Sequence, residues 1–190
     1  MKNKKIRILT ECAILIALGT VLSFAKIWEM PFGGSVTLLS MLPICLIGFM
    51  HGPKWGFGSA FVYSIFQLLT SHVFAWGLSP LVLVVCILFD YIIAFSLLGV
   101  TGCFRLGGES DNVRVIAGTT LAMVLRFVCH YVSGVTIWAS SAPEGWNPWL
   151  WSLVYNGTFM LPELIFTLIA TIIIFNIPAV RRLLAKRAKA

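Results

Sequence analysis

Residues 125–140 read LRFVCHYVSGVTIWAS, an apolar run of helical length that holds an arginine, a histidine and a tryptophan. A charged side chain at the centre of a membrane-spanning helix costs about 2.5–3.5 kcal/mol on insertion scales. Arg126, His130, Gly134 and Trp138 follow one another at intervals of four, so they form a slowly winding stripe on one helix face. Such a stripe indicates either a structural partner or a ligand inside a helical bundle.

The composition of the whole chain is typical of a membrane protein. Of the 190 residues, 59% are hydrophobic and only 11% are charged, and the mean hydropathy is +0.94. These charged side chains are too few to cover the surface of a soluble domain. We therefore expect an all-α integral membrane protein. The length fits one transmembrane domain, residues 1–190, with six helices of roughly 20 residues each. The expected spans lie near 7–25, 36–52, 55–72, 80–104, 113–138 and 149–178.

The basic residues are distributed asymmetrically over these spans and their connections. Six spans put both termini on the same side of the membrane. Apart from Lys26 and Arg126, all Lys and Arg residues fall on that side: Lys2, Lys4, Lys5, Arg7, Lys54, Arg105, Arg114, Arg181, Arg182, Lys186, Arg187 and Lys189. The positive-inside rule therefore predicts a multi-pass protein of the cell (plasma) membrane with both termini in the cytoplasm. The net charge of +7 then reflects this topology and contact with anionic lipid, so we expect no nucleic-acid partner.

Motifs for catalysis, nucleotides and metals are missing from the sequence. There is no phosphate-binding G-x-x-x-x-G-K-[ST] loop, and the five cysteines stand singly without a histidine at metal-ligand spacing. We therefore expect no metal site and no bound cofactor, and any ATP must be hydrolysed by a partner. An intramembrane enzyme that uses Asp90 and His130 as acid and base is a weaker alternative, because no nucleophile or second carboxylate is paired with them. A purely structural membrane subunit is a further alternative.

Polar and aromatic residues fall toward the outer halves of three of the expected spans. Five of them can converge on one pocket near the outer surface: Asp90, His130, Trp138, Trp151 and Asn156. Aromatic faces beside one carboxylate suit a flat, cationic, nitrogen-rich ligand. An asparagine supplies a paired donor and acceptor for the edge of a heterocycle. This combination predicts a vitamin-binding site.

Each of these residues also has a purely structural interpretation when it is taken alone. His130 can hydrogen-bond a neighbouring helix, and Arg126 can pair with an acid or extend to the cytoplasmic interface. Trp138 fits the aromatic belt of a membrane protein, and Glu163 is interpreted as a residue near a helix end.

Several longer segments, taken in order over nearly the whole chain, resemble one transporter family. They are ILTECAILIALGTVLSF (8–24), GGSVTLLSMLPICLIGFMHGPKWG (33–56), DYIIAFSLLGVTGCFR (90–105), HYVSGVTIWASSAPEGW (130–146) and SLVYNG (152–157). The set resembles the ThiT family, the thiamine-specific S components, or substrate-binding subunits, of energy-coupling factor (ECF) transporters. The H-x-x-x-G-x-x-x-W run followed by YNG favours thiamine over the other vitamins that such proteins bind.

The resemblance implies a six-transmembrane-helix bundle of the ECF S-component type, which is a transporter subunit and not an enzyme. It would bind thiamine with high affinity on the outer side and deliver it inward. Its partner would be the ECF module, a transmembrane coupling subunit plus two ATPase subunits that hydrolyse ATP. Another vitamin, or a precursor similar to hydroxymethylpyrimidine, on the same scaffold remains an alternative.

The resemblance also assigns expected roles to individual residues. His130 and Trp138 would line the thiazolium and aminopyrimidine rings, and Gly134 would leave room for the ligand. Asn156 would hydrogen-bond the pyrimidine, and Tyr91 would help to hold the ligand from the fourth helix.

Three positions depart from what members of the family can carry. Asp90 stands where a glutamate can occur, and Trp151 where a tyrosine can occur. Gly34 stands where a stacking tryptophan can occur, with Trp28 as a candidate replacement nearby. These departures affect the individual contacts to the ligand more than its identity.

A pair of small residues in the first span is a candidate docking motif. Ala13 and Ala17 form an A-x-x-x-A pattern, and small residues four apart allow two helices to approach closely in a membrane. The resemblance implies that this face contacts the coupling subunit, whereas the pattern alone also fits packing inside the bundle.

Overall fold

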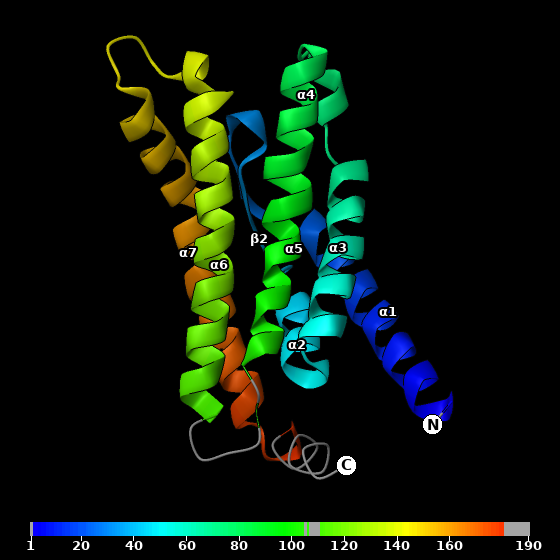
Figure 1. Cartoon of the computed structure of the whole chain (residues 1–190). Coiled ribbons are helices and arrows are strands. Elements are labelled where there is room, and N and C mark those ends of the chain that lie inside the picture. The colour runs from blue at the N-terminus through cyan, green and yellow to red at the C-terminus, as the bar shows by residue number, and fades with distance from the viewer. Residues whose placement is uncertain (1, 105, 107–110, 181–190) are drawn as a thin grey trace.

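The computed structural model describes residues 2–104, 106 and 111–180, and in these ranges the chain folds into six helical rods (Figure 1). Five segments in these ranges are long and apolar enough to cross a membrane, one of them extending over Pro53–Ala75, and the second helix is short. The rods are α1 (Lys2–Phe24), α2 (Leu42–His51), α3 (Pro53–Leu69), a continuous rod over 80–103, α6 (Asp111–Thr136) and α7 (Pro148–Asn176). This is the all-α membrane bundle that the sequence predicts. Of the basic residues behind the predicted orientation, Arg105, Arg181, Arg182, Lys186, Arg187 and Lys189 lie outside the described residues.

The fourth rod changes its helical geometry along its length. It consists of α4 (Pro80–Cys86), the π-helical η3 (Ile87–Ile93), α5 (Ala94–Ser96) and the 3₁₀-helical η4 (Leu97–Cys103). A Cβ atom at Gly99 in η4 would lie only 2.5 Å from Phe57 Cα of α3. The missing side chain therefore allows the backbones of η4 and α3 to touch, as small residues do between helices in membranes.

The second helix differs from the span expected at 36–52. Residues Ser35–Thr37 form β2, which pairs antiparallel with β1 (Lys26–Glu29), and the helix begins only at Leu42. Pro43 lies in its first turn, where a missing N–H group costs nothing, so the expected helix cannot extend back through it. Ten residues at 1.5 Å rise give a helix of about 15 Å, roughly half the thickness of the hydrocarbon core. The part of this prediction before Leu42 was wrong.

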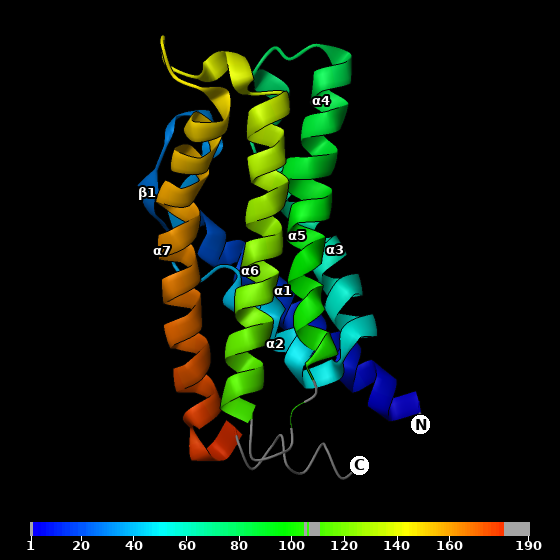
Figure 2. The same ribbon diagram turned by 60° about the vertical axis from the view of Figure 1, so that its left-hand side comes forward.

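The two halves of the bundle carry different elements. The β1–β2 hairpin, the short helix η2 (Val73–Ala75) and the α6–α7 connection lie in one half, which we call the hairpin half (Figures 1 and 2). The first turn of α1, the whole of α2 and the last turn of α7 lie in the other half. The buried apolar core fills the space where α2, α3, η4 and α6 meet, and includes Ile44, Ile47, Ala60, Leu98, Val115 and Met123.

Large apolar side chains also cover the outward faces of the long helices. Ile14, Val21, Leu69, Leu81 and Ile173 each expose more than half of their surface. Helices in lipid have no need to bury such side chains, because hydrocarbon solvates them. The exposed apolar faces therefore indicate the surface that contacts the bilayer.

Candidate functional site

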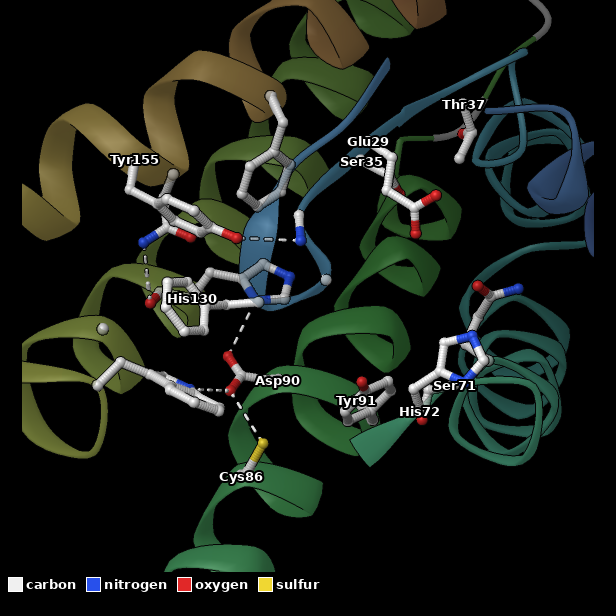
Figure 3. Close-up of a pocket in the computed structure, with 18 of the residues that line it drawn as sticks. Glu29, Ser35, Thr37, Ser71, His72, Cys86, Asp90, Tyr91, His130 and Tyr155 are labelled. Carbon is white, nitrogen blue, oxygen red and sulfur yellow. Dashed lines mark hydrogen bonds and ion pairs between the residues drawn. The ribbon is translucent and has the colours of Figure 1, made fainter. Parts of the chain in front are cut away.

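A pocket with a volume of about 420 Å³ lies in the hairpin half. Its size falls in the usual range for small-molecule sites. Its walls come from the hairpin loop, the end of α3, η3, α6 and α7 (Figure 3). All seven residues that the sequence marks as candidates line it: Asp90, Tyr91, His130, Gly134, Trp138, Trp151 and Asn156.

Asp90 is the centre of a hydrogen-bond network on one wall (Figure 3). Its Oδ1 lies 3.0 Å from His130 Nδ1, and its Oδ2 accepts hydrogen bonds from Ser133 Oγ at 2.6 Å and Trp138 Nε1 at 3.3 Å. The Cys86 thiol adds a contact at 3.4 Å. Because an ionised carboxylate only accepts, Nδ1 of His130 carries the proton. The donors fix the negative charge in one position in the π-helical segment, a geometry frequent at functional sites.

Asn156 on α7 presents a defined hydrogen-bonding edge. Its Nδ2 donates to Ser152 O at 2.9 Å, Ser152 Oγ at 3.1 Å and His130 O at 3.3 Å. Three oxygen atoms around one end of the amide establish that this end is the NH₂ group. Oδ1 is therefore the atom with which Asn156 can accept a hydrogen bond from a ligand.

Gly134 lies where α6 and α7 approach each other closely. A Cβ atom at this position would overlap Ser152 Oγ and lie 3.2 Å from Asn156 Nδ2. Its missing side chain therefore first allows α7 to approach α6, and the space it leaves is taken by Ser152. Gly134 still lines the pocket, and the approach of the two helices places Asn156 at the site.

Aromatic rings form the wall next to Asp90. The ring of Trp138 lies 5.4 Å from that of Trp76 at an interplanar angle of 84°, and 6.0 Å from that of Phe32 at 45°. Trp151 packs against Tyr155 with a centroid distance of 5.5 Å. The candidate set from the sequence lacked Phe32, Trp76 and Tyr155. Phe32 and Trp76 lie in connections between the long helices, where no helical spacing relates them to the other site residues.

The loop before β2 is tethered to α7 by Tyr155. The Tyr155 hydroxyl accepts a hydrogen bond from Gly34 N at 3.1 Å and donates one to Pro31 O. A Cβ atom at Gly34 would lie 2.8 Å from that hydroxyl, so a stacking side chain has no room there. The aromatic ring of this loop comes instead from Phe32, which has a positive φ of 65°, whereas Trp28 is exposed and does not line the pocket.

The remaining candidates have clear positions in the structure. Figure 3 shows Tyr91 beside Ser71 and His72, on the side of the pocket formed by the end of α3. Glu163, expected near a helix end, is instead fully buried inside α7. Ala13 and Ala17 are exposed and line an open groove between α1 and α3, so packing inside the bundle does not use them.

A pocket that holds a carboxylate among aromatic rings inside a helical membrane bundle is typical of small-molecule-binding membrane proteins, a class that includes transporters. The chain matches the family model of the thiamine transporter protein over residues 9–182. It therefore belongs to the thiamine transporter (ThiT) family, whose members are transporter components and not enzymes. Among the described residues, no group of three His, Cys, Asp or Glu side chains could hold a metal ion.

Individual relatives are similar over almost their whole lengths. The chain is 32% identical over 185 residues to the thiamine transporter ThiT of Bacillus subtilis, with 92% of this chain and 93% of that protein covered. It is 24% identical over 190 residues to the thiamine transporter ThiT of Lacticaseibacillus paracasei, with 93% and 90% covered. A solved structure of ThiT from Listeria monocytogenes matches with a TM-score of 0.75 at 27% identity, with 95% and 98% covered.

Proposed function

We propose that this protein is the thiamine-binding S component of an ECF importer in the cell membrane. The observation that carries the proposal is the position of Asp90. Its carboxylate, held by three nitrogen and oxygen donors, lies beside the ring of Trp138 in the pocket of a ThiT-family protein. A fixed negative charge next to aromatic faces is complementary to a flat organic cation such as the thiazolium ring of thiamine.

The two rings of thiamine match two different parts of the pocket. The thiazolium ring is held where Trp138, Trp76 and Phe32 meet, with Asp90 balancing its charge. Each aromatic face contributes about 0.5–2 kcal/mol through cation–π attraction. The aminopyrimidine is read by Asn156, whose Oδ1 accepts a hydrogen bond from the exocyclic amine of the ligand.

Transport requires partners that supply energy. Both termini lie in the cytoplasm in this proposal, so the hairpin half faces outward and thiamine enters from there. The groove at Ala13 and Ala17 contacts a transmembrane coupling subunit, and two associated ATPases hydrolyse ATP. The exposure of both alanines and the open groove support this assignment of the docking face.

The first test is a titration of the detergent-purified protein with thiamine, followed by intrinsic tryptophan fluorescence. Trp76, Trp138 and Trp151 line the pocket and should report binding. We expect saturable quenching that weakens in Trp138→Ala and Asn156→Ala, while hydroxymethylpyrimidine binds more weakly than thiamine. A folded protein that does not respond to thiamine, or that prefers the precursor, would contradict the proposed ligand.

The second test measures uptake of labelled thiamine in cells that contain the protein with or without an ECF module. We expect accumulation above the external concentration only when the module is present. Sustained accumulation without it would contradict the proposed dependence on partner ATPases.

A further inference from the structure

Arg126 places a permanent positive charge on the wall of a pocket proposed to bind a cation. The guanidinium cannot lose its proton under ordinary conditions. The residue is only 5% exposed, and it lines the same pocket as Thr37, Met41 and Phe95. A cation at this position repels the proposed ligand, so its presence needs a reason.

The contacts of Arg126 leave its charge without a direct counter-ion. Nη1 lies 3.5 Å from Met41 Sδ, and Cζ lies 4.3 Å from the centroid of the Phe95 ring. Nε has no hydrogen-bond partner. In the part of the chain that the structure describes, no carboxylate approaches the guanidinium within 4.0 Å.

Two carboxylates lie near enough to act on Arg126 through space, namely Asp90 and Glu163. Glu163 is fully buried, and its Oε1 accepts hydrogen bonds from Thr37 N at 3.1 Å and from Thr37 Oγ1. At the rim, Lys26 and Glu29 form an ion pair and cancel each other. With Asp90 and Glu163 both ionised, Arg126 charged and His130 neutral, the interior of the site carries one net negative charge.

We infer that Arg126 selects ligands by charge: the pocket admits a single positive charge, accepts an added anionic group such as a phosphate ester, and excludes a second positive charge. The inference rests on the proposed function, because it takes thiamine as the parent ligand. A unit charge about 10 Å away at an effective dielectric constant of about 20 changes an affinity roughly tenfold. The effect therefore operates on a ligand group that does not touch the arginine, and Nε offers a direct donor to an oxygen that reaches it.

The test uses three ligands that share one body and differ in the charge of the tail. They are thiamine with its neutral hydroxyl, thiamine monophosphate, and the analogue in which an ammonium group replaces the hydroxyl. The dissociation constant of each is measured by tryptophan fluorescence for the full-length protein. The variants are Arg126→Gln, Arg126→Lys and, as a matched control on the same helix, Arg114→Gln, which removes an exposed charge next to Asp111.

Each result is expressed as the affinity of the charged ligand divided by that of thiamine. We expect Arg126→Gln to lower this ratio about tenfold for the phosphate ester and to raise it about tenfold for the ammonium analogue. Arg126→Lys and Arg114→Gln should keep the wild-type ratios. Ratios that change less than twofold in an Arg126→Gln protein that still binds thiamine would overturn the inference.

A second variant, which removes a negative charge instead of a positive one, keeps the test decisive if Arg126→Gln does not fold. With Glu163 ionised, Glu163→Gln makes the interior one unit more positive, so it should raise the ratio for the ester and lower it for the ammonium analogue. Unchanged ratios in that variant would overturn the inference as well. Wild-type protein that fails to bind thiamine contradicts the proposed function, which is a separate outcome.

Discussion

Replacement of Asp90 by asparagine tests the centre of the proposed site. The change keeps the size of the side chain and removes its charge. The Asp90 carboxylate accepts hydrogen bonds from His130, Ser133 and Trp138. An amide has only one acceptor oxygen, so it cannot accept all three of them in the same way. Asp90→Asn therefore weakens both the attraction for a cation and the order of the wall.

The loss of thiamine affinity expected for Asp90→Asn follows from the attraction between two charges in a buried site. Two unit charges about 5 Å apart attract each other with about 3 kcal/mol at an effective dielectric constant of about 20. This corresponds to a dissociation constant about 100-fold larger when one charge is removed. Asp90→Glu restores the charge and should keep binding within about tenfold of the wild type, because it differs by one methylene group and costs about 1–1.5 kcal/mol in a packed site.

The assay compares thiamine with an analogue that carries a neutral thiophene ring in place of the thiazolium. Both are titrated into wild-type protein, Asp90→Asn and Asp90→Glu, with thermal melting as the control for folding. We expect Asp90→Asn to weaken thiamine much more than the neutral analogue. An equal loss for both ligands, or a change below threefold for thiamine, would refute the electrostatic role of Asp90.

Three further variants examine the helix contact, the loop tether and the docking face. Gly134→Leu should abolish binding and lower the melting temperature, because the new side chain overlaps Ser152; a stable variant that binds normally would contradict the tight α6–α7 contact. Tyr155→Phe removes both hydrogen bonds to the loop. The loss of about 1–1.5 kcal/mol implies that thiamine dissociates about tenfold faster, which stopped-flow fluorescence should show. An unchanged dissociation rate would rule out the tether as a barrier to release. The double variant Ala13→Leu and Ala17→Leu should bind thiamine normally but fail to copurify with the ECF module, and retained copurification would place the docking face elsewhere.

Hydropathy is sufficient to predict the membrane class of this fold and its long helices, but not the hairpin. The β strands are only four and three residues long. Val36 and the residues after it join the apolar run of α2, so they read as one hydrophobic segment. Only Pro43 indicates that the helix starts late, since a proline is tolerated in a first turn. The path of a hairpin that depends on contacts with α7 is a tertiary property that local sequence does not encode.

Helical spacing accounts for the part of the site that could be predicted. The interval of four places His130 and Gly134 along one face of α6, whereas Trp138 lies two residues beyond the end of that helix; all three still line one pocket. The same reasoning applied to the partners of Asp90 would have identified Cys86, four residues earlier on its own rod, and Ser133, three residues after His130. It could not have identified Phe32 or Trp76, because their positions depend on how the connections fold over the pocket.

The buried carboxyl group of Glu163 and the position of the β1–β2 hairpin depend on each other. Thr37 donates its N–H and its hydroxyl to Oε1 of the buried Glu163, so lifting β2 from α7 would leave that side chain without these donors, at a cost of about 1–3 kcal/mol. The tip of the loop is held differently, by two hydrogen bonds of the Tyr155 hydroxyl and by contacts of the Phe32 ring with Trp138 and Tyr155. Movement of the tip around Phe32 breaks these contacts but leaves the hydrogen bonds between Thr37 and Glu163 in place. If the proposed ligand enters by displacing only the tip, Glu163 and the charges around Arg126 keep their positions, so the proposed charge selection would persist in the open pocket.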